Sequence, residues 1–168
     1  DPMPRIAIQT PLYRSSQYLP MLLKSLRAQT FTDWVFYACE NSGDVNEQAR
    51  VKELLEQSGL PHEFFINERN LGFADGHNFL MKKHQAEFIL LLNEDAYLDP
   101  EHLVRCLQRF EADANCAAVA GAVYRWTAPV GQEETLTDDT FIDTLALRYN
   151  CLAHVVDLYA GATRGEAK

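Results

Sequence analysis

The chain has 168 residues, of which 47% are hydrophobic and 23% charged, and its formal net charge is -9. That length suffices for one domain with a substantial core, and the acidic balance argues against non-specific nucleic-acid binding, which depends on lysine and arginine. The apolar runs are shorter than the roughly 18–20 residues that cross a bilayer, and the N-terminal residues do not resemble a signal peptide.

Short apolar segments alternate with amphipathic ones through most of the chain. The apolar segments are bounded by turn residues and predict strands, over residues 5–10, 34–39, 62–67, 87–92 and 116–126. The amphipathic segments have apolar residues at helical spacing and predict helices, over residues 15–29 and 45–58, through 79–81, and from 100 to 110. This alternation predicts an α/β fold, with a Rossmann-like, mainly parallel sheet that carries helices on both faces.

Three local features refine this prediction. Ser15 or Ser16 is expected to cap the first helix, with Pro20 in its first turn. The fourth strand is apolar throughout, which is typical of a strand at the centre of a parallel sheet. After Trp126 the pattern changes to a polar, exposed loop, and then to two short strands within residues 140–149 and 151–160, which could pair antiparallel.

Polar or glycine-bearing residues follow the first four predicted strands. Ligands of open parallel sheets bind at the carboxyl ends of the strands, so these residues are the candidates for a binding site. They are Thr10, Pro11, Leu12, Tyr13 and Arg14; Glu40, Asn41, Ser42, Gly43 and Asp44; Asn67, Glu68, Arg69, Asn70, Leu71 and Gly72; and Asn93, Glu94 and Asp95. Each group alone is typical of a loop, but their agreement on one edge of the sheet predicts a site there.

Two of these groups allow a structural interpretation beside the functional one. Carboxylates at the end of a buried strand can hold a divalent cation together with substrate phosphates, but Asn93 and Asp95 could also simply form a turn. In the glycine loop NLGFADGHN, Gly72 and Gly76 could let the backbone approach a ligand or adopt a positive φ, or the loop could be a plain strand-to-helix turn. Its spacing fits neither a dinucleotide-binding fingerprint nor a Walker loop.

The remaining reactive side chains show no site-like pattern. The histidines, at positions 62, 77, 84, 102 and 154, lack ligand spacing and are expected to be solvated or in the core, although His77 in the glycine loop could contact a ligand. The cysteines, at positions 39, 106, 116 and 151, are expected to be free, buried thiols in a reducing compartment. Asp138 and Asp139 are expected to be solvated rather than catalytic.

Four segments occur in order across residues 5–126: IAIQTPLYRSSQYLPMLLKSLRAQT, YACENSGD, NERNLGFADGHN and LLLNEDAYLDP. Together they resemble the family 2 inverting glycosyltransferases of the GT-A fold, and within them the rhamnosyltransferase-like branch. The resemblance implies substrate contacts from Thr10, Pro11, Tyr13, Glu40, Asn41, Arg69, Asn70, Gly72, Gly76, Asn78 and Asn93. It also implies a catalytic cation, Mg²⁺ or Mn²⁺, on Asp95. Glu40 departs from the family's usual aspartate, and Glu94 from its more common proline.

The resemblance implies transfer of a sugar from a nucleotide diphosphate sugar to a hydroxyl of a glycan or lipid-linked acceptor, with inversion, in polysaccharide or glycan synthesis. It implies a cytoplasmic setting, with peripheral contact at the inner face of a membrane. Residues 1–168 are expected to form one domain, with a donor-binding half over 1–126 and the start of an acceptor half over 127–168. The general base is expected beyond Lys168. Two alternatives stay open: a nucleotidyltransferase, and a non-catalytic nucleotide-sugar-binding module of a larger assembly.

Overall fold

The computed structural model describes residues 3–132, 134–137, 139–144, 146–149, 155–158 and 161–167. The chain forms two compact units, Asp1–Leu103 and Val104–Lys168. The first unit contains the predicted parallel sheet, and the second contains short antiparallel pairs of strands.

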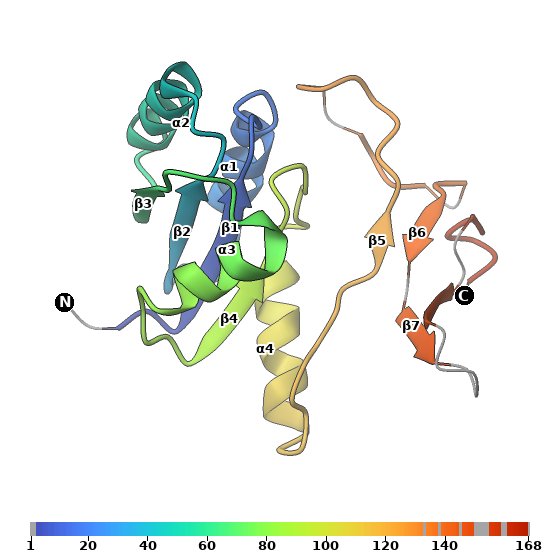
Figure 1. Ribbon diagram of the computed structural model, residues 1–168. Coiled ribbons are helices and arrows are strands. Elements are labelled where there is room, and N and C mark those ends of the chain that lie inside the picture. The colour runs from blue at the N-terminus through green and yellow to red at the C-terminus, as the bar shows by residue number, and fades with distance from the viewer. Residues whose placement is uncertain are drawn as a thin grey trace. The chain divides into compact units, whose positions relative to one another are not determined.

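The first unit is built on four parallel strands in the order β3-β2-β1-β4 (Figure 1). The strands are β1 (Ile6–Leu12), β2 (Trp34–Glu40), β3 (His62–Ile66) and β4 (Phe88–Leu91). The helices that connect them are α1 (Leu19–Arg27), α2 (Val45–Ser58) and α3 (Gly72–Met81), and α4 (His102–Ala112) follows β4. In Figure 1, α3 lies in front of the sheet and α1 behind it. The α/β fold with helices on both faces of a parallel sheet is therefore confirmed.

The core has two sides because side chains alternate between the faces of a strand. On the side of α3, Ala7, Tyr37 and Cys39 pack with Leu80. Alternate residues of the same strands, such as Ile8 and Phe36, are fully buried on the other side of the sheet. This two-sided burial is the reason that β1 and β2 are apolar nearly throughout.

Two predictions about helix starts are wrong. Helix α1 has Tyr18 as its N-cap and no side-chain capping bond, although Pro20 does lie in its first turn. The hydroxyl of Ser16 is engaged elsewhere, with Glu47. The glycine loop is short, because α3 already begins at Gly72 and includes most of the segment that was expected to be a loop.

The prediction of a central fourth strand is also wrong within this sheet. Strand β4 lies at its edge, and the side chains of Ile89 and Leu91 are 40% and 51% exposed. The predicted parallel strand over 116–126 is reduced to β5 (Val123–Tyr124), which pairs antiparallel in a separate sheet. The segment before β5 consists largely of alanine with one glycine, residues that favour strands weakly.

Among its described residues, the second unit contains two antiparallel pairs of strands. Strand β5 pairs with β6 (Ile142–Thr144), and β7 (Ala146–Tyr149) pairs with β8 (Val155–Leu158). The antiparallel pairing predicted for the end of the chain is thus present, although the first predicted strand is divided into β6 and β7. The polar loop after Trp126 contains no helix or strand among its described residues. The expectations for Asp138, Cys151 and His154 lie outside the described residues.

Three other expectations about the side chains and the membrane can be compared with the structure. The described cysteines at positions 39, 106 and 116 are free, but only Cys39 is buried. Of the described histidines, His77 is in the core and the others are half-buried. Every helix in the described part of the chain is too short or too polar to span a bilayer.

A buried polar contact joins β1 to α3 and makes folding sensitive to pH. The side-chain amide of Gln9 lies against His77 and His84, and burial lowers the pKa of both imidazoles below 6.5. At pH values near 6.5, the two histidines of the unfolded chain bind protons that those of the folded chain do not. We therefore expect the free energy of unfolding to fall as the pH drops from about 7.5 to about 6.

Urea unfolding over that pH range measures this slope. A double variant, His77→Gln with His84→Gln, keeps amide groups that can contact Gln9 but does not titrate there, so its slope should be shallower. An equally steep slope in the double variant would show that other groups cause the pH dependence.

Candidate functional site

The carboxyl ends of β1, β2 and β3 lie together and form what we call the carboxyl edge of the sheet. Leu12 is in register with Glu40, and Glu40 with Ile66. The backbone bonding continues past the strands, since Asn41 N donates to Leu12 O over 2.9 Å and Asn67 N donates to Glu40 O over 3.0 Å. The polar residues that follow these strands therefore lie side by side, as the sequence predicted.

The side chains of Glu40 and Asn41 have different hydrogen-bond partners. Glu40 is fully buried, and both of its carboxylate oxygens accept from Ser42 N over 3.0 Å. It thus shapes the turn between β2 and α2. Asn41 is also buried, and its Oδ1 accepts from Asn67 Nδ2 over 2.7 Å. Asn67 was one of the polar residues after β3 but was not among the substrate contacts, and only this contact across the sheet shows that it belongs to the site.

Cys39 lies beneath these amides. Its Sγ is 3.9 Å from Asn41 Oδ1, and burial raises the pKa of its thiol to about 11. The thiol is therefore neutral near pH 7, which excludes it as a thiolate nucleophile under those conditions.

The end of β1 and the loop that follows it combine an exposed aromatic ring with two hydroxyls that lack a described hydrogen-bond partner. Tyr13 is 47% exposed, and the guanidinium of Arg14 lies 5.8 Å from the centre of its ring. Thr10 Oγ1 and Ser15 Oγ are buried and have no hydrogen-bond partner among the described residues. Since buried polar atoms are rarely left unpaired, these hydroxyls are suited to a ligand or to water. Tyr13 offers such a ligand an apolar face.

Helix α3 closely approaches the end of β1. A Cβ atom added at Gly76 would lie 2.8 Å from Cβ of Pro11 and 3.5 Å from Nδ2 of Asn41. Gly76 therefore permits close packing between α3 and the ends of β1 and β2, a role that the sequence did not suggest for it.

The start of α3 shows the positive φ that the sequence suggested for its glycines. Gly72 has a φ of +69°, and its backbone N donates to Asn70 Oδ1 over 2.8 Å. The turn interpretation thus holds for Asn70 and Gly72. The side chains of Arg69 and Asn78 are exposed, while His77 is buried with its ring 4.5 Å from that of Phe73.

Asn93, Glu94 and Asp95 follow β4 at the same edge. Leu92 N donates to Gln9 O over 3.0 Å, which brings this segment next to the end of β1. Ala96 N donates to Asn93 O over 3.3 Å, so the segment does form a turn. Asn93 and Asp95 are exposed, and Glu94 is half-buried. Burial and, secondarily, the charge of Asp95 raise the pKa of Glu94.

These oxygen donors fit a hard divalent cation. Mg²⁺ is usually held by one or two carboxylates together with substrate phosphates, and this turn offers one exposed carboxylate with a second beside it. The described residues contain no group of three or more histidine, cysteine or acidic side chains that would hold a metal by themselves. A cation at Asp95 would therefore need further oxygen ligands, such as substrate phosphates and water.

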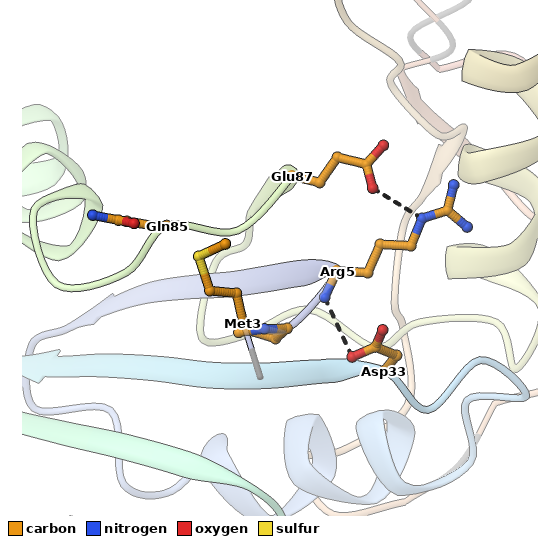
Figure 2. Close-up of a pocket in the computed structure, with 6 residues that line it drawn as sticks. Met3, Arg5, Asp33, Gln85 and Glu87 are labelled. Atoms are coloured by element: carbon orange, nitrogen blue, oxygen red, sulfur yellow. Dashed lines mark hydrogen bonds and ion pairs between the residues drawn. The ribbon is translucent and has the colours of Figure 1, made fainter. Parts of the chain in front are cut away.

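A cleft of about 450 Å³ lies at the amino ends of the strands, opposite the carboxyl edge (Figure 2). Arg5, Asp33 and Glu87 line it, and each directly precedes a strand. Arg5 Nε pairs with Glu87 Oε2 over 3.2 Å, and Arg5 N donates to Asp33 Oδ1 over 3.3 Å. Because ligands of parallel sheets bind at the carboxyl ends of the strands, this cleft is separate from the candidate site.

Comparison with known sequences gives both a family and individual relatives. The model of the family "Glycosyl transferase family 2" matches residues 8–155. A chondroitin synthase of Escherichia coli is 26% identical over 117 residues, which are 70% of this chain and 17% of that protein. An "Uncharacterized glycosyltransferase" of Haemophilus influenzae is 25% identical over 143 residues, covering 79% of this chain and 47% of that protein. The chain thus spans less than half the length of these relatives.

Solved structures share the fold at low sequence identity. S. aureus TarS 1-349 in complex with UDP aligns with a TM-score of 0.58 and 20% identity, over 80% of this chain and 39% of that one. The mannosyltransferase PcManGT from Pyrobaculum calidifontis, in complex with GDP-Man and Mn²⁺, aligns with a TM-score of 0.60 and 17% identity, over 73% of this chain and 35% of that one.

Proposed function

The chain belongs to glycosyl transferase family 2, and on that premise we propose that it binds a nucleotide diphosphate sugar and takes part in moving the sugar to an acceptor hydroxyl, with inversion. The observation that carries this proposal is the polar edge of the sheet. There the segment that contains Asp95 begins beside the end of β1, which carries the Thr10 hydroxyl, unpaired among the described residues, and is followed by the exposed Tyr13. An aromatic face, hydrogen-bonding groups and a carboxylate for a cation are what a nucleoside diphosphate requires.

The residues have distinct proposed roles. The ring of Tyr13 stacks on the nucleobase, as aromatic side chains do with bases, and Thr10 hydrogen-bonds to the nucleoside. Pro11 and Asn41 line the site, and buried Glu40 holds the Ser42 amide and thereby fixes the adjoining turn.

The exposed side chains of Arg69 and Asn93 are proposed to contact the diphosphate. Four residues at and near the start of α3 complete the proposed binding site because they help to set the position of that helix. They are Asn70, Gly72, Gly76 and Asn78. Asp95 would hold Mg²⁺ or Mn²⁺, and the cation would supply positive charge to the diphosphate that leaves.

The acceptor side is assigned by region only. We propose that residues 1–126 bind the donor and that residues 127–168 begin the half that binds a glycan or lipid-linked acceptor, where a carboxylate would serve as general base. A cytoplasmic setting at the inner face of a membrane, and a product that is a polysaccharide or glycan, complete the proposal. The proposal includes the rhamnosyltransferase-like branch because residues 93–95 resemble the Asn-Pro-Asp segment of that branch in their first and last positions, although the relatives named above carry other descriptions.

Calorimetric titration of the 168-residue chain with UDP, dTDP and GDP, each with and without Mn²⁺, tests the donor site. We expect one nucleotide to bind, and to bind at least about tenfold more tightly with the cation. The preferred base would also narrow the donor sugar. If none of the three binds under either condition, the donor-site proposal fails.

Turnover distinguishes the remaining alternative. Family membership disfavours a nucleotidyltransferase, but a non-catalytic binding module is compatible with a chain that spans only part of its relatives. Nucleotide binding without hydrolysis or transfer of the sugar would support the module. Release of the nucleoside diphosphate from its sugar conjugate would support the enzyme.

A further inference from the structure

Glu47 makes a contact that its place in α2 does not explain. Asp44 caps this helix, because its carboxylate accepts from Asn46 N and Glu47 N. A glutamate three residues after such a cap commonly reaches back to the backbone N–H of the capping residue. Here Asp44 N donates instead to Ser42 Oγ over 3.1 Å, and the carboxylate of Glu47 is free to bond elsewhere.

The carboxylate of Glu47 binds the loop between β1 and α1. Its Oε1 accepts from Ser16 N over 2.7 Å, and its Oε2 accepts from Ser16 Oγ over 2.9 Å. Ser16 is only 6% exposed. Two short bonds from one carboxylate to one buried residue form a strong, oriented contact, and this contact joins segments 31 residues apart.

The loop that Glu47 holds has a strained backbone. Arg14 has a φ of 53° and is the only non-glycine residue with a positive φ in the described part of the chain. A side chain in this region is disfavoured, and such a conformation persists only where neighbouring contacts enforce it. Ser16 follows Arg14 by two positions, and Tyr13 directly precedes Arg14. The contact from Glu47 is therefore placed where it can enforce the turn that exposes Tyr13.

We propose that Glu47 is a positioning residue that fixes the β1–α1 loop so that Tyr13 presents its ring to the nucleobase. The inference rests on the proposed donor site and adds to it a residue outside the sheet edge. An acidic residue in the first turn of a helix also stabilises the helix through its dipole. That effect alone would not couple Glu47 to Tyr13.

A double-mutant cycle separates the two roles. Nucleotide affinity is measured by calorimetry, with Mn²⁺ and the best-binding nucleotide, for the wild type, Glu47→Ala, Tyr13→Ala and the double variant. We expect Glu47→Ala to weaken binding about tenfold. Because Glu47 acts through Tyr13, the same change should have little further effect once Tyr13 is alanine.

Two further variants serve as controls. Glu47→Gln keeps an oxygen for Ser16 N and has an amide that can donate to Ser16 Oγ, so it should restore most of the affinity. Glu53→Ala removes another glutamate of α2, whose described contact is with Gln57 on the same helix, and should leave affinity unchanged. If Glu47→Ala fails to fold, Ser16→Ala removes the hydroxyl bond alone and takes its place in the cycle.

The outcomes are distinguishable. Full affinity in Glu47→Ala, or equal losses in the presence and absence of the Tyr13 ring, would overturn the positioning role while the donor site stands. An unchanged affinity in Tyr13→Ala would overturn it as well. If the wild type binds no nucleotide, the proposed function fails and the positioning role fails with it.

Discussion

Asp95→Asn should weaken the cation-dependent binding of the nucleoside diphosphate by about 100-fold, or about 2.7 kcal/mol. The substitution keeps the size of the side chain and removes its charge. Asp95 is exposed at the end of β4, next to the half-buried Glu94, whose pKa is raised. A cation held between this turn and a diphosphate would lose its exposed anionic ligand from the protein, while the turn itself would remain.

The measurement is a pair of calorimetric titrations, with and without Mn²⁺, for the wild type and Asp95→Asn. Glu53→Gln removes the same charge from the exposed surface of α2 and should behave as the wild type does. Thermal unfolding should give similar midpoints for the three proteins, since the backbone bond from Ala96 N to Asn93 O does not involve the Asp95 side chain. If the cation effect is the same in Asp95→Asn, residues 93–95 are a turn and nothing more.

Local pattern predicted the elements of the first unit well. The bounds of β1, β2, β3 and α2 agree with the sequence prediction to within about two residues, because alternation, helical spacing and turn residues are all local signals. The common polar edge followed from the same signals, since parallel strands end together. This is why Glu40, Asn41 and Asn67 were all among the residues predicted to lie there.

The errors concern contacts between segments distant in sequence. The apolar composition of β4 predicted a central strand, but its position depends on which segments pair beside it, and the sequence of β4 does not contain that information. Ser16 was a plausible helix cap, yet its hydroxyl bonds to Glu47, 31 residues away. The burial of Glu40 follows from packing that composition cannot report.

The glycine loop contains both a feature that local sequence predicted and one that depends on a distant contact. Its two glycines predicted an irregular backbone, and Gly72 does adopt a positive φ at the start of α3. Gly76 instead lies within the helix, where glycine is locally unfavourable. Its contact with Pro11 supplies the reason for a glycine there, because a larger residue would not fit between α3 and the end of β1.

Gly76→Ala should therefore destabilise the protein by about 1–3 kcal/mol, the range for overpacking a close contact. Helix propensity alone predicts the opposite sign, a gain of up to about 1 kcal/mol. The added Cβ would lie 2.8 Å from Cβ and 2.9 Å from Cγ of Pro11, atoms of a rigid ring that cannot turn aside. Displacement of α3 would also shift Asn41 and Pro11, so nucleotide affinity should fall with stability.

Urea unfolding and nucleotide titration of the same samples measure both effects. Gly72→Ala is the matched comparison: its φ of +69° makes alanine strained, but a Cβ there would meet nothing within 4 Å. Combining Gly76→Ala with Pro11→Gly removes the ring that the new methyl group contacts, so the two changes should cost less together than the sum of their separate costs. If Gly76→Ala instead stabilises the protein, propensity outweighs contact, and α3 does not pack against β1 as closely as we infer.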